Sequence, residues 1–174
     1  MTPPDLTGLT VPQADRAAFV GQFGHLFEHS PWVVERAWEK RPFADGEALH
    51  AAFVDVLAEA GEAERLALIR SHPELADKAA IDAGLTAESA SEQAGAGLDR
   101  LSPDEYARFH ALNRAYRDRF GFPFVICVRL HDKAGILEAM RTRLAGDDDE
   151  LSQALVQVLL IVRFRLADAL GAPS

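Results

Sequence analysis

The chain has 174 residues, of which 48% are hydrophobic and 26% charged, and its formal net charge is -9. This composition is typical of a globular protein that buries a substantial core, and it excludes an intrinsically disordered chain. The acidic charge argues against nucleic-acid binding, because phosphate recognition needs a clustered surface of Lys and Arg. If the ligand is an anion, its pocket must therefore be locally positive.

The sequence shows no targeting or membrane-spanning segment and has little cysteine. No stretch approaches the roughly 20 apolar residues that span a bilayer, and the N-terminus has neither the basic nor the apolar region of a secretory signal peptide. Cys127 is the single cysteine, which excludes an internal disulfide and a cysteine-based metal cluster. The sequence therefore predicts a cytoplasmic protein that does not bind membranes.

Apolar residues recur at helical spacing in the first half of the chain. One stripe covers residues 19–27, after which Ser30 is a suitable N-cap for the next helix. Further stripes predict helices over residues 32–41, 49–60 and 62–72, separated by Pro42 and Gly61 and ended by Pro73.

The second half carries clearer helix boundaries. Thr86 can cap a fifth helix, and Ser102 with Glu105 forms a capping box that opens a helix ending at Gly121. The last two helices are predicted over residues 133–145, after the cap Asp132, and over residues 151–170. The sequence therefore predicts an all-α fold, a single-domain helical bundle of about seven to eight helices over residues 1–174.

Residues 122–130 (FPFVICVRL) are the exception to the helical pattern. They are apolar and β-prone, but no other segment offers a convincing partner strand. We expect an extended segment, or a helix begun after Pro123, inside the bundle. Buried main chain without a sheet partner must find hydrogen bonds elsewhere, and a polar ligand could supply them.

Two places could carry chemistry. His72 lies at a helix end next to Pro73, where it could act as an acid or base near neutral pH. Ser89, Glu92 and Gln93 have the i, i+3, i+4 spacing of one helix face, and very small residues follow them. From these local patterns alone, a structural histidine and a solvated amphipathic helix are the commoner interpretations.

The remaining candidates are weaker. His25 and His29 have the i, i+4 spacing of a metal-binding pair, but no third ligand follows at a familiar distance, so no metal site is predicted. Cys127 lies in an apolar run, which favours an inert buried thiol. The sequence has neither a Gly-rich phosphate loop nor a Gly-Xaa-Ser-Xaa-Gly nucleophile elbow.

Five separate segments together resemble one known family. They are residues 28–32 (EHSPW), 71–75 (SHPEL), 85–89 (LTAES), 91–98 (SEQAGAGL) and 120–129 (FGFPFVICVR). The set closely resembles the 2-oxo-4-hydroxy-4-carboxy-5-ureidoimidazoline (OHCU) decarboxylases of urate breakdown. The resemblance extends from about residue 9 to about residue 170. Because of this resemblance, we favour functional roles for His72 and Glu92 over the structural roles that the local patterns suggested.

This resemblance implies an all-helical, homodimeric lyase without a cofactor or metal, which converts OHCU to (S)-allantoin and carbon dioxide. By position, His72 matches the family's catalytic histidine and Glu92 its essential carboxylate. The implied substrate-binding residues are Pro73, then Ser89, Ala90, Ser91, Glu92 and Gln93, and the main chain of Phe124, Val125, Ile126, Cys127 and Val128.

The resemblance also implies a catalytic arginine on the last helix, where Arg163 and Arg165 compete. Helical geometry does not separate them, because they flank the apolar stripe on opposite sides. The family's pattern of an arginine between two apolar residues, with leucine following, favours Arg165. Arg70 and Arg129 are further sources of positive charge.

Two other functions remain open at this point. A non-catalytic helical protein could keep the pocket as a ligand-binding site without turnover. A related lyase or hydrolase could act on another ureido acid. The joint presence of a histidine, a glutamate and an arginine argues against a non-catalytic protein. It discriminates less well against a related lyase or hydrolase.

Overall fold

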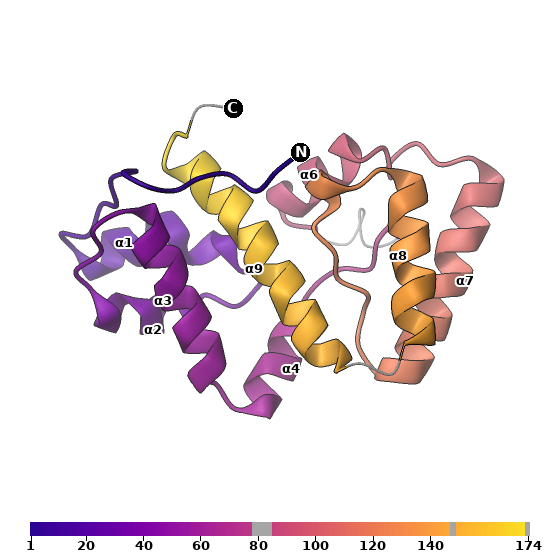
Figure 1. Ribbon diagram of the computed structural model, residues 1–174, viewed down its shortest axis with the longest axis horizontal. Coiled ribbons are helices and arrows are strands. Elements are labelled where there is room, and N and C mark those ends of the chain that lie inside the picture. Colours follow the sequence, from indigo (N-terminus) through magenta and orange to yellow (C-terminus); the bar gives the residue numbers. More distant parts are fainter. Residues whose placement is uncertain (78–84, 147–148, 173–174) are drawn as a thin grey trace. The chain divides into compact units, whose positions relative to one another are not determined.

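The computed structural model describes residues 1–77, 85–146 and 149–172. Over these ranges it contains eight α-helices, three short 3-10 helices and no strand (Figure 1). The α-helices are α1 (Arg16–Phe23), α2 (Trp32–Ala37), α3 (Gly46–Glu59), α4 (Glu62–Arg70), α6 (Ala87–Gly95), α7 (Pro103–Phe120), α8 (Lys133–Ala145) and α9 (Glu150–Ala169). The 3-10 helices are η1 (Gly24–Leu26), η2 (Trp38–Lys40) and η3 (Val128–Leu130). The predicted all-α fold is confirmed. None of the described helices is long and apolar enough to cross a membrane.

Contacts between residues divide the chain into two compact units. Unit 1 comprises His72–Gln157 together with Met1, and unit 2 comprises Thr2–Ser71 with Val158–Ser174. Helix α9 contributes residues to both units, and each unit is described by itself below. A single domain over residues 1–174 stays a prediction.

The core of unit 2 contains aromatic side chains from α1, from α3 and from the segment just after η1. The rings of Phe19 and Phe23 meet edge to face at 4.9 Å, and those of Phe27 and Phe53 at 5.2 Å. Such pairs add about 0.5–1.5 kcal/mol to the free energy gained from burying their surface. Helices α2 and α3 pack against each other within this core.

The start of α2 differs from the sequence prediction. Pro31 occupies the N-cap position and makes no side-chain cap. The carbonyl of Ser30 accepts a hydrogen bond from the amide of Val33 at 3.3 Å, so the turn is closed by main chain. The prediction of Ser30 as the N-cap was therefore wrong by one residue.

Unit 1 confirms the caps that local sequence predicted. The hydroxyl of Thr86 accepts from the amide of Ser89 at the start of α6. At the start of α7, the hydroxyl of Ser102 accepts from the amide of Glu105 at 3.2 Å, and the Glu105 carboxylate accepts from the amide of Ser102 at 2.8 Å. Helix α7 ends at Gly121, whose φ of 74° is left-handed. Helices α7 and α8 pack side by side (Figure 1).

Residues 122–130 are extended until they turn into η3, so the predicted extended segment is confirmed and the alternative helix after Pro123 is wrong. The segment is almost wholly buried. Its Phe122 and Phe124 rings pack edge to face on Tyr116 of α7, with ring centres 6.0 and 5.3 Å away. Aromatic packing thus holds an apolar main-chain segment inside a helical unit without a sheet.

Candidate active site

The segment that follows α4 carries His72, which is only 9% exposed. Two amide side chains hold the residues just after it. Asn113 of α7 donates its amide to the carbonyl of Leu75 at 2.8 Å, and the Gln93 side-chain carbonyl accepts from the amide of Ala76 at 3.1 Å. Ala76 has a φ of 60°, a left-handed conformation that costs a residue with a side chain about 1–2 kcal/mol. Helices α6 and α7 thus hold this segment in a strained turn.

Helix α6 turns the predicted polar face inward. Ser89 and Gln93 are buried, and the side chain of Glu92 is 9% exposed, whereas Ala90 and Ser91 are exposed. Gln93 uses its carbonyl to hold Ala76, which leaves the opposite end of its amide as a donor. The i, i+3, i+4 spacing read from the sequence therefore corresponds to one partly buried polar face.

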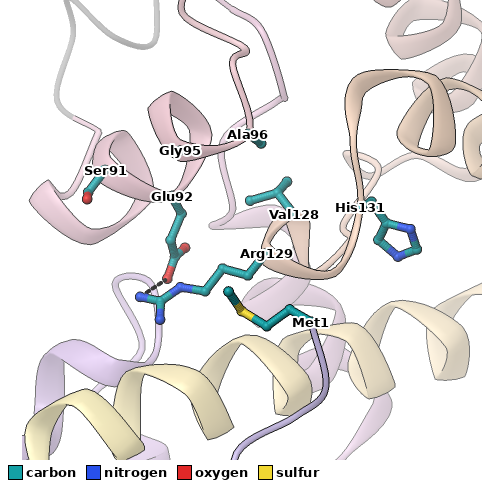
Figure 2. A pocket seen from close by; sticks show the side chains of 8 residues that line it. All are labelled: Met1, Ser91, Glu92, Gly95, Ala96, Val128, Arg129 and His131. Carbon is teal, nitrogen blue, oxygen red and sulfur yellow. Dashed lines mark ion pairs between the residues drawn. The ribbon is translucent and has the colours of Figure 1, made fainter. Parts of the chain in front are cut away.

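A pocket of about 260 Å³ lies between α6 and η3 in unit 1 (Figure 2). Its lining residues are Met1, Ser91, Glu92, Gly95, Ala96, Val128, Arg129 and His131. The Glu92 carboxylate and the Arg129 guanidinium point toward each other across it, 3.8 Å apart, whereas the His131 ring points away from them. That distance is longer than a hydrogen bond, and the Arg129 side chain is 30% exposed. The pocket thus presents one acidic and one basic group beside a small apolar wall.

The main chain of residues 124–128 is held by side chains from outside the segment. Arg143 of α8 donates to the carbonyl of Val125 at 2.8 Å, and the Gln157 side chain of α9 accepts from the amide of Cys127 at 3.0 Å. Between these two anchored residues, the amide and carbonyl of Ile126 make no hydrogen bond with any part of the chain that the structure describes. Ile126 is 4% exposed. Buried main-chain groups of this kind are usually paired, so Ile126 is a candidate ligand contact.

Sequence patterns did not reveal the group that holds Arg143. Its Nε donates to Glu150 at 2.8 Å, and its guanidinium lies 4.4 Å from the ring centre of Phe124. The Tyr116 hydroxyl also donates to Glu150. Burial of the Tyr116 phenol, and then its hydrogen bond to Glu150, raise the pKa of Tyr116 above its ordinary value, so the phenol stays neutral. The acidic first residue of α9 and the basic last turn of α8 were visible in the sequence, but each is usual for a helix end.

Comparison with known proteins agrees with this architecture. The sequence profile described as OHCU decarboxylase matches residues 12–167. The chain belongs to the OHCU decarboxylase family. A 2-oxo-4-hydroxy-4-carboxy-5-ureidoimidazoline decarboxylase of Halalkalicoccus jeotgali is 39% identical over 167 residues, covering 94% of this chain and 93% of that protein. The protein of the same name from Mus musculus is 40% identical over 164 residues, covering 92% and 90%.

Solved structures show the same fold. A structure titled (S)-allantoin synthase matches with a TM-score of 0.70 and 28% identity, covering 92% of this chain and 52% of that one. A structure titled OHCU decarboxylase in the presence of (S)-allantoin has a TM-score of 0.68 and covers 86% of this chain and 98% of that one. Its identity is 18%, so this second likeness concerns the fold alone. Membership of the OHCU decarboxylase family, which the five sequence segments predicted, is confirmed.

In unit 2, the two arginines of α9 have different partners. Arg163 donates its Nε to the carbonyl of Pro4 at 2.8 Å and its Nη1 to Glu47 at 3.0 Å. Arg165 is 4% exposed and donates to the carbonyl of Leu26 at 3.2 Å and to Glu28 at 3.4 Å. Arg163 therefore joins the N-terminal segment to α3, which is a structural role.

Proposed function

We propose that this chain decarboxylates OHCU to (S)-allantoin and carbon dioxide without a cofactor, as the last step of urate breakdown. The main support for this proposal is the pocket in which Glu92 and Arg129 face each other. The chain that forms this pocket belongs to the OHCU decarboxylase family. The pocket volume of about 260 Å³ is just below the range of about 300–1,000 Å³ found for drug-sized ligands. It therefore suits a small metabolite.

The substrate itself explains why the reaction needs no cofactor. Its carboxylate is attached to a carbon beside a ring C=N bond. When the bond to the carboxylate breaks, carbon dioxide leaves and the electron pair is delocalised onto the ring nitrogen. A pyridoxal or thiamine electron sink would therefore be redundant. The enzyme must orient the carboxylate, stabilise charge on the ring and deliver a proton to one face only.

His72 and Glu92 have the central roles in this proposal. His72 hydrogen-bonds the hydroxyl on the reacting carbon and serves as the acid and base. Glu92 accepts hydrogen bonds from ring or ureido N–H groups, which orients the ring and selects the face that is protonated. From the family resemblance, we assign Pro73, Ser89 and Gln93 to substrate binding, together with Ala90 and Ser91 of the same helix as Ser89. The firm anchoring of the turn at Ala76 supports a fixed place for the nearby histidine.

Positive charge must offset the substrate's carboxylate in a chain whose net charge is -9. Arg129 supplies it at the pocket, where its guanidinium is partly exposed. From the family resemblance, we further assign Arg165 as the arginine that binds substrate charge. The structural contacts of Arg163 with Pro4 and Glu47 support this choice over Arg163.

The proposal extends to assembly and location. The family resemblance supports a homodimer, and the single cysteine suits the reducing cytoplasm. Light scattering after size exclusion tests the assembly, since a dimer of the 19.0 kDa chain would have twice that mass.

The activity can be tested directly. OHCU is generated in place from urate with urate oxidase and hydroxyisourate hydrolase, the protein is added, and circular dichroism follows the appearance of optically active allantoin. We expect a faster rise of one enantiomer than in the control without this protein. A trace identical to that control would contradict the proposed activity, and binding of the product without turnover would favour the non-catalytic alternative.

A further inference from the structure

The main chain around Ile126 is anchored on both sides by residues that no sequence motif indicated. On one side the Val125 carbonyl accepts from Arg143 of α8, and on the other the Cys127 amide donates to Gln157 of α9. The two anchors come from different helices and act on adjacent peptide groups. Between them, the amide and carbonyl of Ile126 have no hydrogen-bond partner within the described part of the chain.

The Arg143 anchor is itself held rigidly. Glu150 accepts from its Nε at 2.8 Å, the Tyr116 oxygen accepts from its Nη2 at 3.4 Å, and the Phe124 ring lies under its guanidinium. The Arg143 side chain is 15% exposed and that of Glu150 is 5% exposed. A planar guanidinium with partners along its edges and a ring on its face has little freedom to move. The position of the Val125 carbonyl is thus determined by three elements of unit 1.

We infer that Arg143 and Gln157 are positioning residues that set the main chain of Ile126 for hydrogen bonding to the substrate. This inference rests on the proposed function and on the binding of OHCU by the main chain of residues 124–128, which the family resemblance implies. It adds the two side chains that fix the geometry of this contact, because a binding group has to be held within about 0.5 Å of its productive position. Neither residue touches the reacting atoms in this scheme.

A purely structural role for the same contacts predicts a different result. In that case, removal of the Gln157 acceptor lowers the unfolding temperature and leaves the kinetic constants of the folded fraction unchanged. A positioning role predicts a weaker contact with bound ligand. Because a main-chain group binds the substrate and the transition state alike, its displacement raises KM and changes kcat little.

Gln157 offers the cleaner test because it is only partly buried. Gln157→Met keeps the length of the side chain and removes the acceptor oxygen, whereas Gln157→Glu keeps that oxygen. Gln153→Met makes the same change at an exposed position one turn earlier on α9. We expect Gln157→Met to raise KM about tenfold, which is the size of effect that one lost hydrogen bond can have. Gln157→Glu should retain most of the affinity, and Gln153→Met should match the parent chain.

A binding measurement separates this inference from the proposed activity. The ¹⁵N-labelled protein is titrated with (S)-allantoin while the amide resonance of Ile126 is followed. We expect this resonance to shift in the parent chain, and the dissociation constant to rise about tenfold in Gln157→Met, as for KM. Arg143→Lys keeps the positive charge but loses the planar, multiply hydrogen-bonding guanidinium. This variant should also shift the Ile126 resonance in the free protein.

The outcomes are distinct. An active parent chain whose Gln157→Met and Gln153→Met variants behave alike overturns the inference and leaves the proposed function. An inactive parent that still binds (S)-allantoin at Ile126, more weakly in Gln157→Met, removes the proposed activity and supports the positioning role. A parent that neither turns over OHCU nor binds (S)-allantoin removes both.

Discussion

The two units use carboxylate–guanidinium pairs in contrasting ways. In unit 1, Glu92 and Arg129 stand 3.8 Å apart beside a pocket, and the arginine side chain is 30% exposed. In unit 2, Arg165 and Glu28 are 3.4 Å apart, but their side chains are only 3% and 1% exposed. The distances are similar and the access to solvent is not. Exposure to solvent, rather than the presence of an ion pair, therefore distinguishes the two pairs, each within its own unit.

This contrast has an energetic consequence. Removing one member of a fully buried pair leaves a charge without its counter-charge away from water, which strongly destabilises the fold. A partly exposed partner such as Arg129 can instead be solvated when its carboxylate is neutralised. Changes at the pocket pair should thus affect turnover more than folding, and changes at the buried pair should affect folding first.

The largest expected effect is on turnover. We expect Glu92→Gln, and likewise His72→Ala, to lower kcat/KM by a factor of about 10² to 10⁴, the usual contribution of a positioned acid or base group. Glutamine keeps the shape of Glu92 but loses the negative charge that orients the substrate's N–H groups. The coupled urate assay measures this, and the unfolding temperature shows whether each variant folds.

Glu88→Gln, one turn earlier on α6, is the matched control for Glu92. It removes the same charge from the same helix and should keep most of the activity. Full activity in folded His72→Ala would refute the assigned acid and base, and equal losses in Glu88→Gln and Glu92→Gln would show a general effect of charge on α6.

The next effect in size concerns the stability of unit 2. Arg165→Met removes the guanidinium from a buried Glu28 and should lower the free energy of unfolding by about 3–5 kcal/mol. Arg163→Met acts on Glu47, whose side chain is 36% exposed, and should cost about 1 kcal/mol or less. Urea denaturation of both variants measures the difference. Equal losses would mean that burial does not distinguish the two pairs.

A rescue experiment sharpens this result. Neutralising both members, as in Arg165→Met with Glu28→Gln, should recover part of the stability lost in Arg165→Met alone, because the Glu28 side chain is then uncharged as well. If the double variant is less stable than either single variant by the sum of their losses, the two residues do not interact.

Local signals explain how far sequence alone could predict the fold. The capping box of Ser102 and Glu105 spans four residues, so its pattern determines its structure almost independently of the rest. The same reasoning failed at Ser30, because the neighbouring Pro31 took the N-cap position instead. For residues 122–130 the sequence left two alternatives, an extended segment or a helix after Pro123, and the structure shows an extended course that ends in η3. The hydrogen-bond partners of this segment could not be predicted.

Long-range contacts account for what could not be predicted of the candidate site. Arg143 reaches Val125 across 18 positions, and Gln157 reaches Cys127 across 30. No motif near either side chain in sequence marks it as an anchor: Arg143 lies among polar residues of α8, and Gln157 is a lone amide in an apolar stretch of α9. Family resemblance nominated His72 and Glu92, and their catalytic roles stay predictions. The packing of α6 against η3, which joins Glu92 to Arg129, required the three-dimensional structure.

The smallest expected effect is the pH dependence of the Arg163–Glu47 pair. Hydrogen bonds from Arg163 and from the amide of Leu6 hold the pKa of Glu47 below its ordinary value, which is about 4.3 in model peptides. A carboxyl group whose pKa is lowered by folding stabilises the fold fully above its unfolded pKa. That stabilisation is lost as the pH falls through the lower pKa of the folded state.

We therefore expect the parent chain to be more stable than Glu47→Gln at pH 7, and the difference to shrink as the pH falls below about 4 and to vanish below the lower pKa of the folded state. The unfolding temperature of both proteins, measured between pH 7 and pH 2.5, gives the curve. In an Arg163→Met background the difference at pH 7 should shrink, because only the Leu6 amide then holds the carboxylate. If the difference in unfolding temperature persisted unchanged at low pH, or were the same with and without Arg163, Glu47 would have a packing role instead of an electrostatic one.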